Sequence, residues 1–280
     1  MIVRFSDGID LGKIVDSGQC FSCGGEDGVF WFLSAGRLIL TRQLDGRTIE
    51  AFCDEADWSL FWSAFFDAPR DYSLLRRQMK KKGGLDSAAA EEGAGLRVLR
   101  QDAWETLVSF IVSQRKSIPA IRGCLRKLSG YGNPVTIPPA ALKAAGDSAL
   151  KSQLACLRSL PSPEVLSRLT PEQLAGCGTG YRAAYLHDAA EHVASCDTDL
   201  AALSALDNGA LQDALMRIKG VGVKVADCVM LFAYGRTDAV PADVWIRRVM
   251  RRDPSVFEGL SDPGLAQQYL FLYARNHKSV

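Results

Sequence analysis

The sequence lacks several features that would place it in a specialised class of protein. None of its apolar stretches is long and uninterrupted enough to span a membrane. The formal net charge is only +1, so the overall charge does not indicate a nucleic-acid partner, although such a total can conceal local basic patches. No secretory segment is recognisable, and the eight cysteines are scattered, which predicts reduced thiols in an intracellular protein.

Cysteine pairs at metal-binding spacing are also scarce. Cys20 and Cys23 are three positions apart, but no second pair lies within the distance that a zinc site requires. We therefore expect no metal at this pair.

The chain has enough apolar residues, 48% of 280, to bury a large core. Its beginning predicts an antiparallel sheet with one covered face, because β-branched and aromatic runs alternate in polarity between Gly-containing turns. The predicted strands are residues 2–5, 29–33, 37–41 and 47–52, and a helical period follows over 58–66.

The rest of the chain is predicted to be almost wholly helical, because helix formers and apolar spacing recur between Ser-Pro, Thr-Pro and Asp start signals. The predicted helices are residues 103–113, 117–129, 140–145, 163–169, 171–175, 181–196, 199–206, 209–218, 223–233, 243–251 and 264–276. Residues 82–95, rich in Gly, Ala and Glu, are the predicted linker. We therefore predict an α+β fold, with an N-terminal α+β domain over 1–94 and an all-α bundle over 95–280.

Two clusters of basic residues stand out against the low net charge. We interpret Arg76, Arg77, Lys80, Lys81 and Lys82 as part of a solvated, mobile segment, because the predicted linker follows them. The second cluster, formed by Arg247, Arg248, Arg251 and Arg252, begins four residues after Asp243, and we predict that it contacts phosphate.

The most informative stretch is residues 215–245. A short turn, Lys219-Gly220-Val221-Gly222, joins two apolar helical runs, and Lys224 lies just inside the second run. Glycines let backbone N–H groups approach an anion closely, and the N-terminus of the following helix favours negative charge. The turn therefore predicts binding to a nucleic-acid phosphate, with Lys224 as an amine nucleophile. The alternative is an ordinary turn, with Lys224 solvated and paired with Asp227.

The hairpin, Lys224, Cys228 and the sequence Val240-Pro241-Ala242-Asp243 together resemble the helix-hairpin-helix DNA glycosylase superfamily. Three further segments make the sequence similar to the 8-oxoguanine DNA glycosylase family. They are DLGKIVDSGQCF at 10–21, GLRVLRQDAWETLVSFI at 95–111 and GLAQQYLFLY at 264–273. The resemblance implies that the helical region is a helix-hairpin-helix glycosylase bundle, whose C-terminal helix closes the base pocket.

The resemblance implies a bifunctional DNA glycosylase and AP lyase that removes 8-oxoguanine from duplex DNA. Such an enzyme must extrude the nucleotide from the helix. Lys224 would attack C1′ as the base leaves, and the resulting Schiff base would allow β-elimination. Asp243 would stabilise positive charge on the sugar, and it could also cap a helix.

The family also implies roles for four residues of the base pocket. Cys228 and Phe271 would be the two walls that sandwich the base, with ordinary helix core as the alternative role. Gln267, one helical turn before Phe271, would bond the pairing edge of the base. The carbonyl of Gly18 would accept from N7–H of 8-oxoguanine and repel N7 of guanine; otherwise Gly18 would be part of an ordinary turn.

The implied DNA contacts depart from the family pattern around the opposite base. Arg115 stands where an asparagine inserts into the stack, and Ala120 stands where an arginine reads cytosine. Arg182 matches the second cytosine-reading arginine, and Tyr181 would be a wedge. We therefore predict a weaker preference for cytosine. The predicted DNA-contacting residues are Arg115, Tyr181, Arg182, Lys219, Gly220, Gly222, Trp245, Arg247 and Arg248.

The chemistry requires no cofactor. Hairpins of this superfamily often hold Na⁺ or K⁺ through backbone carbonyls, which by position would be those of Met216, Ile218 and Val221. No cysteine follows Cys228, so we expect no iron–sulfur cluster. The expected partner is double-stranded DNA containing 8-oxoguanine, not a membrane, and we expect a monomer, cytoplasmic and at the nucleoid in a prokaryote.

Two other functions are compatible with the hairpin. A monofunctional glycosylase for alkylated bases shares the hairpin and the aspartate but normally lacks the lysine. A non-catalytic helix-hairpin-helix DNA-binding protein would need neither Lys224 nor Asp243. Both residues are present, which favours the bifunctional enzyme.

Overall fold

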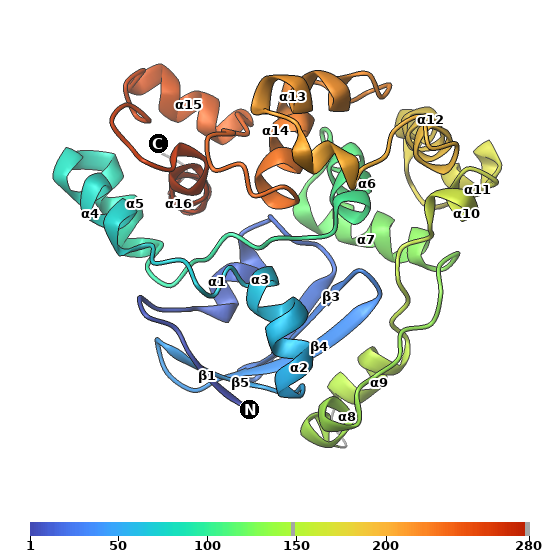
Figure 1. Cartoon of the computed structure of the whole chain (residues 1–280), viewed down its shortest axis with the longest axis horizontal. Coiled ribbons are helices and arrows are strands. Elements are labelled where there is room, and N and C mark those ends of the chain that lie inside the picture. The colour runs from blue at the N-terminus through green and yellow to red at the C-terminus, as the bar shows by residue number, and fades with distance from the viewer. Residues whose placement is uncertain (147–148, 278–280) are drawn as a thin grey trace.

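The computed structural model describes residues 1–146 and 149–277 and has an α+β fold, as predicted (Figure 1). A five-stranded antiparallel sheet comes first, and most of the remaining chain is helical. In Figure 1 the sheet lies below a layer formed by most helices of the second half, whereas α8 (Pro139–Ala145) and α9 (Ala149–Ala155) lie at the lower right.

The sheet has the order β1-β5-β4-β3-β2. Its strands are β1 (Ile2–Arg4), β2 (Cys23–Glu26), β3 (Val29–Ser34), β4 (Arg37–Gln43) and β5 (Thr48–Ala51). The four predicted strands correspond to all of these except β2. The sequence of β2 is Cys-Gly-Gly-Glu, which has no β-branched residue. Its glycines are needed, because a Cβ on Gly25 would overlap the ring of Phe30 on β3.

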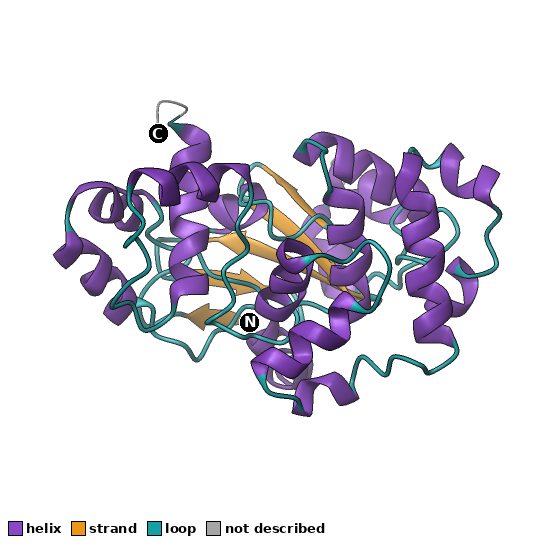
Figure 2. Cartoon of the chain, turned by 90° about the horizontal axis from the view of Figure 1, so that it is seen from above, coloured by secondary structure: helices purple, strands orange, loops and turns teal. Residues whose placement is uncertain are grey.

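Helices cover both faces of the sheet, so the prediction of one covered face is wrong (Figure 2). Ile39 of β4 packs in one core with Phe32 and Trp62, beside α1 (Leu11–Asp16), α2 (Glu55–Asp57), the π-helical turn η1 (Trp58–Trp62) and α3 (Ser63–Phe65). Its neighbours Leu38 and Leu40 pack in another core with α8 and α9. Alternate side chains of one strand therefore reach both faces.

The helical half closely follows the predicted pattern. Besides α8 and α9, of which α9 was not predicted, it contains α6 (Ala103–Ser113), α7 (Ile118–Ser129), α10 (Pro163–Leu166), α11 (Pro171–Gly176), η2 (Gly180–Arg182), α12 (Ala183–Ala194), η3 (Ala202–Ala205), α13 (Asn208–Met216), α14 (Val223–Phe232), α15 (Val244–Arg252) and α16 (Pro263–Asn276). Predicted start signals act as caps: Thr170 forms a capping box with Gln173 at α11. The predicted helix at 199–206 is only the short 3₁₀ turn η3.

Two further predictions are wrong: that residues 82–95 are a linker, and that the basic cluster at 76–82 belongs to a solvated, mobile segment. Residues 73–92 form α4 (Ser73–Lys82) and α5 (Gly84–Glu92). The leucines, arginines and lysines of α4 and the alanines of α5 are good helix formers. Helix α5 packs against α16. Arg76 pairs with Asp7 at 3.1 Å, and Lys82 Nζ donates to the carbonyls of Ser255 and Val256 at 2.7 and 2.9 Å.

A buried arginine joins the N-terminal segments to the start of the helical half. Arg97 is 1% exposed and pairs with Asp7 at 2.7 Å. Its guanidinium also donates to the carbonyls of Gly8, Phe66 and Asp67. Because such a charge is costly to bury without partners, this network fixes how the two halves meet.

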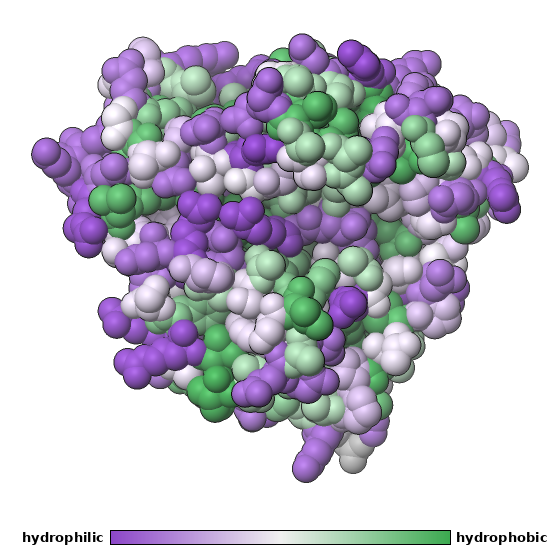
Figure 3. Space-filling view, in the orientation of Figure 1, coloured by the Kyte–Doolittle hydropathy of each residue, from purple (hydrophilic) through white to green (hydrophobic). Residues whose placement is uncertain are grey.

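No helix in the described residues is both long and apolar enough to cross a membrane. The face shown in Figure 3 carries hydrophobic residues only in small groups, separated by hydrophilic ones.

Candidate active site

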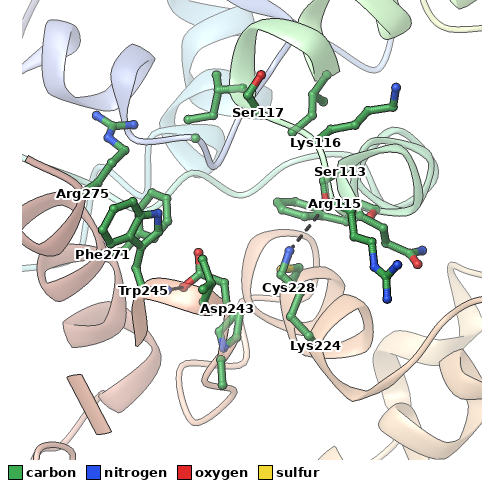
Figure 4. A pocket seen from close by; sticks show the side chains of 18 of the residues that line it. Ser113, Arg115, Lys116, Ser117, Lys224, Cys228, Asp243, Trp245, Phe271 and Arg275 are labelled. Carbon is green, nitrogen blue, oxygen red and sulfur yellow. Dashed lines mark hydrogen bonds between the residues drawn. The ribbon is translucent and has the colours of Figure 1, made fainter. Parts of the chain in front are cut away.

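A cavity of about 1050 Å³ lies where the N-terminal and helical halves meet. Six parts of the chain line it: residues 17–21, residues 110–121 of α6, α7 and the loop between them, Tyr181, α14, residues 241–251 and α16. In Figure 4, Lys224 and Cys228 lie on one side, Phe271 and Trp245 lie opposite, and Asp243 lies between them. The volume is sufficient for an extruded nucleotide.

The amine of Lys224 is held inside this cavity. Its Nζ lies 3.5 Å from Ser113 Oγ and 5.0 Å from the centre of the Phe110 ring. The alternative pairing with Asp227 does not form, because Asp227 accepts from Gln212 Nε2 at 2.7 Å. Lys224 therefore has a polar neighbour and an aromatic face to hold it, and it remains available to a reactant.

Asp243 is a helix cap, which is one of the roles predicted for it, and it also lines the cavity. It is the N-cap of α15, and its Oδ1 accepts from the N–H groups of Trp245 and Ile246 at 3.0 and 2.9 Å. Burial raises the pKa of the carboxyl, although those hydrogen bonds and the charge of Lys224 act to lower it. The bonds fix the carboxylate while it lines the cavity with Lys224.

The two predicted base walls also line the cavity, on opposite sides (Figure 4). Cys228 is 1% exposed, and burial raises the pKa of its thiol to about 11, so it is protonated at neutral pH. Phe271 belongs to α16. A neutral thiol facing an aromatic ring suits a flat, uncharged base.

Gly18 lies beside Phe271 in the cavity lining. Its φ is +73°, and a Cβ there would lie 2.9 Å from Cδ1 of Ile118 and 3.6 Å from Cε1 of Phe271. Both the backbone conformation and the close approach therefore favour glycine. Gln267 is 2% exposed, and its Nε2 donates to the carbonyl of Pro241 at 3.1 Å.

The hairpin between α13 and α14 lies beside the cavity rather than in its lining. Gly220 has φ +82°, and a Cβ there would overlap the ring of Tyr185. The N–H of Lys219 donates to Asp188 at 2.8 Å. Within the described residues, the N–H groups of Gly220 and Gly222 donate to no acceptor, which leaves them available to an anion.

Arg182, like the hairpin residues, lies outside the cavity lining. It is 5% exposed. Its guanidinium stacks 4.3 Å from the centre of the Tyr181 ring and donates to the carbonyls of Thr179 and Gln114. Tyr181, Arg115, Trp245, Arg247 and Arg248 do line the cavity. Arg115 is exposed with φ +52°, so the loop between α6 and α7 presents it in a strained conformation.

Sequence reasoning missed several residues of this site. The further lining residues include Ser113, Lys116, Ser117, Ile118, Pro241, Gln268 and Arg275. Two of them lie next to predicted residues in the sequence, and this proximity could have identified them: Pro241 is two residues before Asp243, and Gln268 follows Gln267. Arg275 follows Phe271 by one helical turn on α16, so the same periodicity could have found it.

The lining is strongly basic in spite of the low net charge of the chain. Seven lining residues are cationic and one, Asp243, is acidic; the cationic ones are Arg115, Lys116, Lys224, Arg247, Arg248, Arg251 and Arg275. Such a cavity favours a polyanionic ligand.

Metal-binding side chains do not cluster in the part of the chain that the structure describes, where no group of three His, Cys, Asp or Glu residues could hold an ion. Cys20 and Cys23 are buried free thiols. The thiol of Cys23 donates to the carbonyl of Cys20 at 3.4 Å.

Comparison with known proteins gives matches along most of the chain. Residues 2–107 match the family described as 8-oxoguanine DNA glycosylase, N-terminal domain, and residues 108–262 match the HhH-GPD superfamily base excision DNA repair protein. A probable N-glycosylase/DNA lyase of Methanothermobacter thermautotrophicus is 30% identical over 211 residues. This alignment covers 68% of the chain and 66% of the length of that relative.

Two solved structures are similar over nearly their whole length. MBOgg1 in complex with a low affinity DNA ligand has a TM-score of 0.87 and 34% identity, covering 99% of this chain and 96% of that one. The 8-oxoguanine glycosylase/lyase of Clostridium acetobutylicum, in complex with double-stranded DNA containing cytosine opposite 8-oxoG, has a TM-score of 0.84 and 26% identity, covering 99% and 98%. The chain therefore belongs to the 8-oxoguanine DNA glycosylase family within the HhH-GPD superfamily of base excision repair proteins.

Proposed function

We propose that this protein excises 8-oxoguanine from duplex DNA and then cleaves the strand as an AP lyase. The observation that carries the proposal is that Lys224 and Asp243 line one cavity together with Gly18, Cys228, Gln267 and Phe271. An amine, a carboxylate and two walls for a flat base are the groups that such chemistry needs in one place. The basic lining would bind the flanking phosphates.

In the proposed reaction the neutral Nζ of Lys224 bonds to C1′ while the C1′–N9 bond breaks, and the base leaves with the electron pair and takes up a proton. Opening of the sugar ring gives a Schiff base. Loss of a proton from C2′ then breaks the C3′–O bond and nicks the strand. Asp243, fixed by its two backbone hydrogen bonds, stabilises positive charge on the sugar during the first step.

Borohydride trapping on a duplex with one 8-oxoguanine tests this assignment, because it reduces a Schiff base to a stable adduct. We expect wild-type protein to form a covalent adduct and Lys224→Gln to form none. Lys116→Gln is the matched control, since Lys116 also lines the cavity but its Nζ donates to the carbonyl of Gly178 at 2.8 Å. It should still be trapped. An adduct in Lys224→Gln would reject Lys224 as the nucleophile.

The same assay separates the other two functions. Base release without trapping would indicate a monofunctional glycosylase, and binding without release would indicate a DNA-binding protein. The position of Lys224 in the cavity argues against both. Asp243→Asn should retain DNA binding and lose much of the excision rate; undiminished turnover would remove Asp243 from the mechanism.

A relaxed preference for the opposite base belongs to this proposal. Ala120 has no hydrogen-bonding side chain, and the guanidinium of Arg182 already donates to Thr179 and Gln114 in the free protein. Reading cytosine with Arg182 would require those bonds to be exchanged. Excision rates opposite each of the four bases test this, and a strong cytosine preference would contradict it.

The remaining parts of the proposal concern the surroundings of the enzyme. The carbonyls of Met216, Ile218 and Val221 would hold Na⁺ or K⁺, although the Ile218 carbonyl also accepts from the N–H of Val221 at 3.0 Å. No other cofactor is needed. The protein would act as a monomer on DNA inside the cell, at the nucleoid in a prokaryote.

A further inference from the structure

Two adjacent glutamines of α16, Gln267 and Gln268, form a chain of hydrogen bonds along the cavity wall. Gln267 Nε2 donates to the carbonyl of Pro241 at 3.1 Å, and Gln268 Nε2 donates to Gln267 Oε1 at 2.7 Å. Both glutamines and Pro241 line the cavity. The two side chains are 2% and 4% exposed.

The orientation of both amides follows from the first bond. A carbonyl can only accept, so Gln267 must turn its NH₂ group toward Pro241 and its oxygen toward Gln268. Gln268 must then turn its own NH₂ group toward that oxygen. This leaves Gln268 Oε1 at the end of the chain, buried and without a hydrogen-bond partner.

An unpaired buried acceptor destabilises a folded protein, so its retention in a cavity wall calls for a ligand that supplies the donor. The pairing edge of guanine and of 8-oxoguanine carries one acceptor, O6, and two kinds of donor, N1–H and the exocyclic NH₂. A single primary amide can pair with O6 and N1–H together. Gln267 has the required groups left, one N–H and one lone pair, after its bonds to Pro241 and Gln268. The exocyclic NH₂ then still lacks an acceptor.

We propose that Gln268 Oε1 accepts a hydrogen bond from the exocyclic amine of the extruded base, which makes Gln268 a second specificity-determining residue. This rests on the proposed excision of 8-oxoguanine. Gln268 also positions Gln267, because its NH₂ group fixes the direction of the Gln267 amide. The pair together reads the whole pairing edge.

The test compares two lesions that differ only in this amine: 8-oxoguanine and 8-oxohypoxanthine, each opposite cytosine in the same duplex. Single-turnover excision rates give a ratio of the two for each protein. We expect wild-type protein to favour 8-oxoguanine and Gln268→Met, which has a similar volume and no amide, to reduce that ratio about 3–10-fold. Gln212→Met is the matched control, because Gln212 bonds Asp227 on α14 and does not line the cavity. Its ratio should equal that of wild type.

The outcomes separate this inference from the function on which it rests. An unchanged ratio for Gln268→Met would overturn the inference, and equal slowing on both lesions would show that Gln268 has only a structural role. A wild-type ratio near one would overturn it without any variant, which covers the case that Gln268→Met fails to fold. Wild-type protein that excises neither lesion would instead reject the proposed function, and this inference with it.

Discussion

The two glycines of the hairpin should respond very differently to the same substitution. In Gly220→Ala the new methyl group would sit on a backbone with φ +82°, which costs a residue other than glycine about 1–2 kcal/mol. It would also overlap Cγ and Cδ2 of Tyr185 and lie 2.8 Å from Cδ1, and relieving such overpacking costs about 1–3 kcal/mol. We therefore expect Gly220→Ala to lower the free energy of unfolding by about 2–5 kcal/mol.

Gly222→Ala is the control within the same turn. Gly222 is exposed with φ −99°, and a Cβ there would meet nothing within 4 Å. Loss of a glycine N-cap should cost less than about 1 kcal/mol. If a DNA phosphate binds the free N–H groups of the turn, however, the methyl group would hinder its approach. We therefore expect Gly222→Ala to keep its stability and to lose DNA affinity about tenfold or more.

Thermal unfolding and titration of a fluorescent duplex at fixed salt would measure both effects. The stability difference predicts a fall in Tm of about 4–20 °C for Gly220→Ala only. A change within about 0.5 kcal/mol for Gly220→Ala would refute the strain argument. Unchanged DNA affinity in Gly222→Ala would exclude the hairpin from the DNA interface.

Three other residues carry sharp predictions. Gly18→Ala should reduce excision of 8-oxoguanine far more than DNA binding, measured by kcat and Kd, because its Cβ would lie 2.9 Å from Ile118 and displace the carbonyl beside Phe271. The acid limb of the excision rate should lie above the ordinary pKa of an aspartic acid, because burial raises the pKa of Asp243; a limb at or below that value would contradict Asp243 as the group that must be ionised for excision, with a pKa raised by burial. Burial raises the pKa of Glu105 from 4.5 to about 7, so the folded state binds this proton more tightly than the unfolded chain does. The free energy of unfolding should therefore decrease as the pH rises from 4.5 to about 7. Glu105→Gln should flatten this pH dependence of Tm, and an unchanged slope would be the contrary result.

Much of this site could be predicted because its residues are close in sequence or share a helical face. Lys224 and Cys228 are one turn apart on α14, and Gln267 and Phe271 are one turn apart on α16, so periodicity places each pair on one face. Helix periodicity and Pro or Asp start signals likewise located most helices. These are local signals, which a sequence displays directly.

The errors came from interactions between distant residues. Residues 82–95 read as a linker by composition, but Gly93 is required there for a close contact: a Cβ on it would overlap Tyr269 of α16. Lys82 is not solvated, because three carbonyls of residues 255–258 accept from its Nζ. Strand β2 forms despite its low β propensity because Gly24 and Gly25 leave room for Trp31 and Phe30 on the neighbouring strand. No local pattern contains these partners.

The near-neutral net charge gave the weakest sequence argument, and the fold explains why. The +1 total sums 33 basic and 32 acidic residues wherever they lie, whereas a ligand responds to the local field. Many acidic residues are used in pairs away from the cavity, as Asp7 is with Arg76 and Arg97. The cavity lining retains seven cations against Asp243 alone. That single carboxylate therefore lies among positive charges, and in the proposed reaction it would offset a developing cation on the sugar while the surrounding arginines would bind phosphate.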